Sequence, residues 1–108
     1  MMSVEAGDMK LEQVTLRIVR DIDPEGIFLF GSQARGEATP SSDYDIALIF
    51  SSQEQVRPGL QRAHRLLWPR PFPVDLIGLT KESFHNGHTA LTRQVLKEGR
   101  SLYWKNEH

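Results

Sequence analysis

The 108-residue sequence contains no cysteine. This absence excludes disulfide bonds, thiolate zinc sites, iron–sulfur clusters and cysteine nucleophiles, and it agrees with a reducing compartment. No apolar run approaches the ~18 residues that a membrane-spanning helix requires. Residues 1–10 are polar and acidic, unlike a signal peptide. We therefore expect a small soluble domain located in the cytoplasm, without a membrane partner.

The sequence also lacks an excess of basic residues. Thirteen Lys and Arg are offset by 14 Asp and Glu, which gives a formal net charge of −1. Proteins that coat nucleic acid are strongly basic, so we do not expect direct nucleic-acid binding. Segment 57–70 carries arginines and no acid, and it is either a solvated helix face or a docking surface for an acidic partner or for nucleic acid. Its arginines are Arg57, Arg62, Arg65 and Arg70.

Hydrophobic periodicity predicts an alternation of helices and strands. Apolar residues recur at spacings of three and four in three segments, which predicts helices over 9–22, from Pro58 onward and over 89–98. Short apolar segments predict strands over 27–30, 44–50 and 74–79, and residues 101–104 form a further strand or a docked tail. This pattern is typical of an α/β fold built on a small sheet. Periodicity leaves the strand order open.

Three carboxylates stand at or inside predicted strands. Asp43 and Asp45 are two residues apart at the entry to one strand, so both side chains point to the same face. Asp75 lies within the apolar strand that begins at Val74, where we expect burial to make an uncompensated charge expensive. Converging carboxylates repel one another unless a cation joins them. Hard divalent ions, Mg²⁺ above all, prefer such all-oxygen sites and bring substrate phosphates with them.

A second polar group follows the first predicted strand. Gly31 allows the backbone to approach a ligand closely, and Ser32 offers a hydroxyl beside exposed amide groups. A short helix over 32–35 would add N–H groups suited to an anion, and Arg35 on the same turn could contact a triphosphate. A phosphate cradle beside a carboxylate metal site describes a phosphoryl or nucleotidyl transfer centre.

These motifs resemble a known superfamily. Gly31-Ser32, ten further residues and then Asp43-Tyr44-Asp45 are similar to the G-S-x(10)-D-x-D signature of DNA polymerase β-like nucleotidyltransferases. With Arg35-Gly36 and Val74-Asp75-Leu76-Ile77 included, the sequence resembles the minimal nucleotidyltransferase (MNT) family, whose members are about this long.

The resemblance implies the roles of the site residues. Gly31 and Ser32, with Arg35, would hold the terminal phosphates of a nucleoside triphosphate, most simply ATP. Asp43 and Asp45 would ligate two Mg²⁺ ions. Asp75 would complete one metal site and help to deprotonate the attacking hydroxyl.

The resemblance also implies the fold, the domain organisation and the partner. We expect one nucleotidyltransferase domain over residues 1–108, with a small mixed sheet flanked by helices. MNT proteins typically act as antitoxins to HEPN-domain ribonucleases, so the expected function is transfer of AMP from ATP to a hydroxyl on such a partner. Whether the chain also forms a homo-oligomer stays open.

Two other functions stay open at this point. The chain could neutralise a HEPN ribonuclease by binding alone, as an antitoxin without chemistry. It could instead modify a small molecule, as antibiotic nucleotidyltransferases do. The complete set of three acids favours catalysis, because a pure binder has no use for three carboxylates that repel one another.

Overall fold

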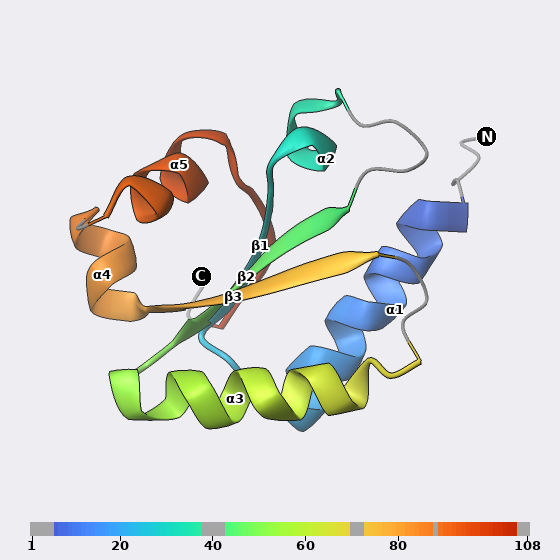
Figure 1. The fold of residues 1–108 in the computed structure, drawn as a ribbon, viewed down its shortest axis with the longest axis horizontal. Coiled ribbons are helices and arrows are strands. Elements are labelled where there is room, and N and C mark those ends of the chain that lie inside the picture. The colour runs from blue at the N-terminus through green and yellow to red at the C-terminus, as the bar shows by residue number, and fades with distance from the viewer. Residues whose placement is uncertain (1–5, 38–42, 70–72, 88, 106–108) are drawn as a thin grey trace.

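A computed structural model of the chain describes residues 6–37, 43–69, 73–87 and 89–105 (Figure 1). Arg70, which belongs to the arginine-bearing segment, lies outside the described residues. The helices are α1 (Ala6–Asp21), α2 (Ser32–Arg35), α3 (Gln53–Leu66), α4 (Lys81–Asn86) and α5 (Ala90–Glu98). The strands are β1 (Gly26–Phe30), β2 (Tyr44–Phe50), β3 (Val74–Thr80) and β4 (Arg100–Trp104).

The sheet is mixed, in the order β3-β2-β1-β4. β2 and β3 are parallel, and α3 forms the crossover connection that a parallel pair requires. β1 runs antiparallel to both β2 and β4. The expected small mixed sheet flanked by helices is therefore confirmed. Within the described part of the chain, no helix combines the length and the apolar composition needed to cross a membrane.

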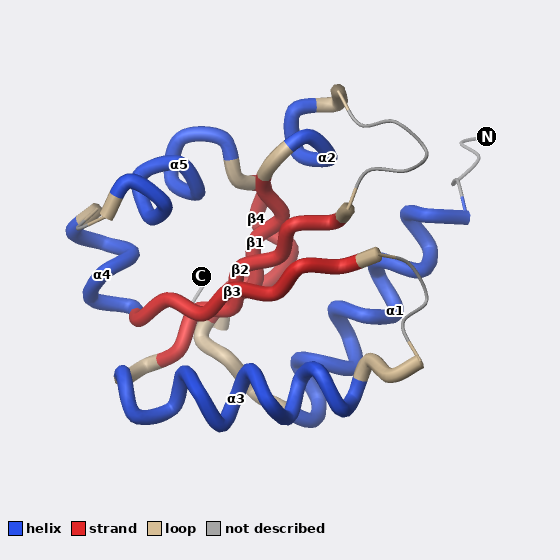
Figure 2. Tube along the Cα trace, viewed as in Figure 1, coloured by secondary structure: helices blue, strands red, loops and turns tan. Residues whose placement is uncertain are grey.

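Helices cover both faces of the sheet (Figure 2). α1 and α3 pack on one face, over a core that includes Ile18, Leu29 and Leu48. α4 and α5 pack on the other face, over a core that includes Ala47 and Val95. Neighbouring strand residues thus alternate between two apolar layers, as the period of two in a strand requires.

The structure corrects three of the predicted helices. α1 begins at Ala6, before the expected start. α3 begins at Gln53 and contains Pro58, because Val56 packs against the core and extends the apolar stripe toward the N-terminus. In α5 the four-residue spacing of Leu91 and Val95 predicts that both are buried. Val95 is buried as expected, whereas Leu91 is 39% exposed and Thr92 is the second buried residue.

Gly59 tests how closely α3 packs on the sheet. A Cβ atom at Gly59 would overlap the ring of Phe50, which is buried in the core. Gly59→Ala should therefore lower the free energy of unfolding by about 1–3 kcal/mol, as overpacked cores do. Alanine in place of glycine otherwise stabilises a helix by ~1 kcal/mol. Chemical denaturation measures the change, with the exposed substitution Gln61→Ala in the same helix as control. A stability gain in Gly59→Ala would contradict this packing.

Candidate active site

The predicted site residues meet at one edge of the sheet. β2 pairs with β1 at Phe30↔Asp45 and with β3 at Asp45↔Asp75. Residues opposite one another in neighbouring strands share a face, and the flanking core residues place this row on the face that α4 and α5 cover. Gly31 follows Phe30 directly, so the register brings Gly31, Asp45 and Asp75 together.

The acidic residues of this edge interact electrostatically. The pKa of Asp45 is raised above its ordinary value, first by partial burial and then by the negative charges of Asp75 and Asp43. Arg35 acts in the opposite direction and lowers the pKa of Asp45. Asp43 and Asp75 are thus both close enough to Asp45 to disfavour its ionisation.

The structure corrects the expected burial of Asp75. This side chain is exposed, whereas Val74 and Leu76 on either side of it are buried. β3 is an edge strand, and its alternation turns Asp75 away from the α1/α3 core. An exposed Asp75 therefore needs no cation to offset the cost of burial. A cation at Asp75 is instead supported by the strand register, which places Asp75 opposite Asp45.

Gly31 fits closely against the acidic edge. Its φ of 75° and ψ of −158° lie in a region that L side chains avoid. A Cβ atom at this position would overlap the carboxylate of Asp45. Only glycine lets the backbone that enters α2 lie this close to Asp45.

Arg35, the last residue of α2, forms ion pairs with two carboxylates. Its Nε donates to Glu37 at 2.7 Å and its Nη1 donates to Glu98 at 3.0 Å. The Gly31 amide also donates to Glu98, at 3.2 Å. Glu98 is not among the residues that the sequence predicts for the site, because 67 residues separate it from Gly31 and no local pattern links the two.

The donor chemistry of the edge fits a hard divalent cation. Asp43, Asp45 and Asp75 offer carboxylate oxygens alone, the ligands that Mg²⁺ prefers. Among the described residues, no three His, Cys, Asp or Glu side chains are gathered as a preformed metal site. The three acids therefore lie on one edge without converging on a single point. A cation between them would relieve the repulsion that raises the pKa of Asp45.

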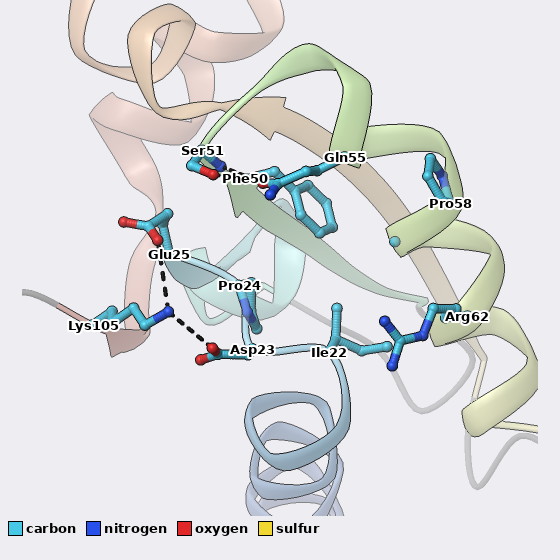
Figure 3. A pocket seen from close by; sticks show the side chains of 11 residues that line it. Ile22, Asp23, Pro24, Glu25, Phe50, Ser51, Gln55, Pro58, Arg62 and Lys105 are labelled. Atoms are coloured by element: carbon cyan, nitrogen blue, oxygen red, sulfur yellow. Dashed lines mark hydrogen bonds and ion pairs between the residues drawn. The ribbon is translucent and has the colours of Figure 1, made fainter.

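A pocket of about 380 Å³ lies at the opposite end of the strands (Figure 3). It is lined by the residues before β1, by the end of β2 and by one face of α3. Lys105 in this pocket contacts Asp23 and Glu25, and Arg62 donates to the carbonyl oxygen of Asp21. Phe50 on its wall is five residues along β2 from Asp45, roughly 16 Å at the rise of a strand. The pocket is therefore separate from the acidic edge.

Comparison with known proteins identifies the family. Residues 12–108 match the family model described as polymerase beta, nucleotidyltransferase. The chain belongs to the polymerase β nucleotidyltransferase family. No curated protein is significantly similar to this nucleotidyltransferase in a sequence search.

Solved structures share the fold. A chain of a toxin–antitoxin complex crystallised with AMP-PNP is 25% identical, with a TM-score of 0.63 over 88% of this chain and 74% of that one. A chain of the complex between tri-AMPylated Shewanella oneidensis HEPN toxin and MNT antitoxin is 24% identical, with a TM-score of 0.56 over 87% and 70%. A candidate nucleotidyltransferase of Sulfolobus solfataricus is 18% identical, with a TM-score of 0.62 over 99% and 95%. The resemblance to polymerase β-like and MNT proteins stated from the motifs is confirmed.

The raised pKa of Asp45 predicts a pH-dependent stability. Ionisation of Asp45 is less favourable in the folded than in the unfolded chain, so it lowers stability as the pH rises from the ordinary aspartate pKa through the raised one. In metal-free buffer, Asp45→Asn should therefore raise the Tm by a few degrees at neutral pH. The difference should vanish in acid, where Asp45 is protonated in both states. Thermal melts across this pH range measure it, and a lower Tm for Asp45→Asn at neutral pH would contradict the repulsion.

Proposed function

We propose that this nucleotidyltransferase transfers AMP from ATP to a hydroxyl group on a HEPN-domain toxin and releases pyrophosphate. The observation that carries the proposal is the proximity of Gly31, Asp45 and Asp75. The turn formed by residues 31–37, which we propose as the phosphate-binding turn, therefore lies directly beside two paired carboxylates. Two similar structures support the choice of donor and acceptor. One complex was crystallised with AMP-PNP, and another contains a tri-AMPylated HEPN toxin.

The reaction forms a bond between the acceptor oxygen and the α-phosphorus. The bond from the α-phosphorus to the oxygen that bridges to the β-phosphate breaks, and pyrophosphate leaves. In the proposed mechanism Gly31, Ser32 and Arg35 hold the β- and γ-phosphates: Gly31 by letting the backbone come close to them, Ser32 through its hydroxyl and Arg35 through its guanidinium donors. The close approach at Gly31 keeps the turn beside Asp45. The donated nucleotide is thereby held with its α-phosphate at the acidic edge.

Asp43, Asp45 and Asp75 would hold two Mg²⁺ ions. Bound Mg²⁺ would stabilise charge on the attacking and leaving oxygens during an in-line displacement. Asp75 would also take part in removing the proton of the acceptor hydroxyl. Its exposure on an edge strand leaves room for an acceptor carried by another protein.

A non-catalytic antitoxin is the second candidate function. Two of the similar solved structures are toxin–antitoxin complexes, and an antitoxin of this kind would silence its toxin by contact alone. The three acids of the edge favour catalysis over this alternative. A protein that only binds has no need for Asp43 and Asp75 beside Asp45, where their charges disfavour its ionisation.

Incubation with ATP labelled on the α-phosphate and Mg²⁺, with and without a HEPN partner, separates these functions. We expect label and an added AMP mass on the partner, and none when EDTA is present. Asp45→Asn and Asp75→Asn should reduce the transfer rate on the order of a hundredfold or more. The exposed substitution Asp21→Asn at the end of α1 serves as control.

Other outcomes of this experiment contradict the proposal. A tight complex without label would favour the non-catalytic antitoxin. Label on a small molecule or RNA would overturn the protein acceptor. Transfer at the wild-type rate by Asp75→Asn would exclude this carboxylate from the chemistry.

The phosphate-binding turn is tested separately from the chemistry. Gly31→Ala adds a Cβ atom where the backbone is left-handed and Asp45 is in contact, so we expect nucleotide affinity to fall sharply. Ser32→Ala removes one hydroxyl and should weaken binding by about 1–2 kcal/mol, roughly 5- to 30-fold. Titration calorimetry with a non-hydrolysable ATP analogue and Mg²⁺ measures both. Normal binding by the two variants would place the phosphates elsewhere.

A further inference from the structure

Glu98, the last residue of α5, joins this helix to both ends of the phosphate-binding turn. Its Oε1 accepts hydrogen bonds from the Gly31 amide at 3.2 Å and from Arg35 Nη1 at 3.0 Å. A third bond comes from Gln94 Nε2 at 2.9 Å, one helical turn earlier in α5. Gln94 and Arg35 help to hold the pKa of Glu98 below its ordinary value, so the carboxylate is ionised at neutral pH.

Packing holds α2 to the rest of the fold only in part. The helix has four residues, and none of them is fully buried, although Ala34 packs partly buried against the α1/α3 core. Its internal bonds, from the Ala34 and Arg35 amides to the Gly31 carbonyl, shape the turn but do not anchor it. Glu98 supplies an anchor, because α5 is fixed to the sheet by the buried residues Thr92 and Val95.

We propose that Glu98 is the positioning residue of the phosphate-binding turn: its carboxylate fixes the Gly31 amide and the Arg35 guanidinium relative to α5 and the sheet. This role rests on the proposed function and deepens it. Glu98 acts through Gly31 and Arg35 and does not touch the nucleotide. A shift of about 1 Å in such a cradle is enough to weaken binding or catalysis strongly.

The geometry leaves Arg35 able to bind an anion while Glu98 holds it. A guanidinium has five N–H donors. Glu98 engages Nη1 and Glu37 engages Nε, so donors remain for a phosphate. The opposite role, in which Glu98 occupies the phosphate position and competes with the nucleotide, predicts a change of opposite sign when Glu98 is replaced.

The first measurement is the Kd for a non-hydrolysable ATP analogue with Mg²⁺, by titration calorimetry. Glu98→Ala should weaken binding about tenfold or more, because it removes a charge-assisted bond and an amide acceptor. Glu98→Gln keeps an acceptor for the Gly31 amide and loses the ion pair, so its Kd should lie between those of wild type and Glu98→Ala. Glu82→Gln, on the exposed side of α4, is the matched control and should bind as wild type does.

The second measurement is hydrogen exchange in the nucleotide-free protein. Loss of the anchor should speed exchange of the amides of residues 31–37 in Glu98→Ala, while the amides of α1 and β2 exchange as in wild type. This readout does not depend on nucleotide binding. It therefore decides the anchoring role even if wild type binds no nucleotide, a result that would overturn the proposed function alone.

Three results would overturn the positioning role. Tighter nucleotide binding by Glu98→Ala would show that Glu98 competes with phosphate. Unchanged exchange over residues 31–37 would show that the turn is held without it. A fall in Tm with the Kd unchanged in Glu98→Gln, which preserves the shape of the side chain, would assign Glu98 to fold stability.

Discussion

The pairing of Asp45 with a neighbour on each side is the constraint on which the site depends. Phe30 on β1 and Asp75 on β3 both lie opposite Asp45. A slip of one residue in β3 would turn Asp75 toward the α1/α3 core and bring a buried leucine to the site face. The two apolar layers therefore fix the register, because each requires the apolar side chains of the strands to face it. The same strand pairing thus determines both the packing of the core and the geometry of the site.

The mixed sheet explains why the polar groups gather at one edge. β1 ends where β2 and β3 begin, because β1 is antiparallel to β2 whereas β3 is parallel to it. The Gly31 turn after β1 thus meets Asp45 near the start of β2 and Asp75 near the start of β3. The crossover α3 starts at the opposite end of the strands, beside the separate pocket around Lys105 (Figures 1 and 3).

The sequence predicts the strands and the acidic edge well because both depend on local patterns. Apolar runs bounded by glycine and polar residues mark β1 and β2, and the i, i+2 spacing of Asp43 and Asp45 predicts a shared face, although β2 itself begins at Tyr44. Burial is predicted less well, because it depends on neighbours in space. Asp75 is predicted to be buried because its strand is apolar, yet the strand is at the edge of the sheet and the side chain is exposed.

The start of α3 is predicted too late, because Pro58 is typical of the first turn of a helix. In the structure the helix begins earlier, at Gln53, and Val56 packs against the core. The contact of Glu98 with Gly31 cannot be predicted from local sequence, since only the packing of α5 on the sheet brings the two residues together.

Arg35 interacts strongly with Glu37 and Glu98 and only weakly with Asp45. On one side Glu37 and Glu98 pair with its guanidinium and raise the Arg35 pKa. On the other side its attraction is the smallest of the named influences on Asp45, below the repulsion from Asp75 and Asp43. A cation already engaged by two carboxylates does little to neutralise a third. The charge of Asp43, Asp45 and Asp75 is therefore left largely uncompensated by Arg35. In the proposed function, a nucleotide carrying Mg²⁺ would supply both charges together, with the metal held by the carboxylates and the terminal phosphates held by Ser32 and Arg35. The same electrostatics disfavour a bare triphosphate, whose charge would meet the three acids without compensation.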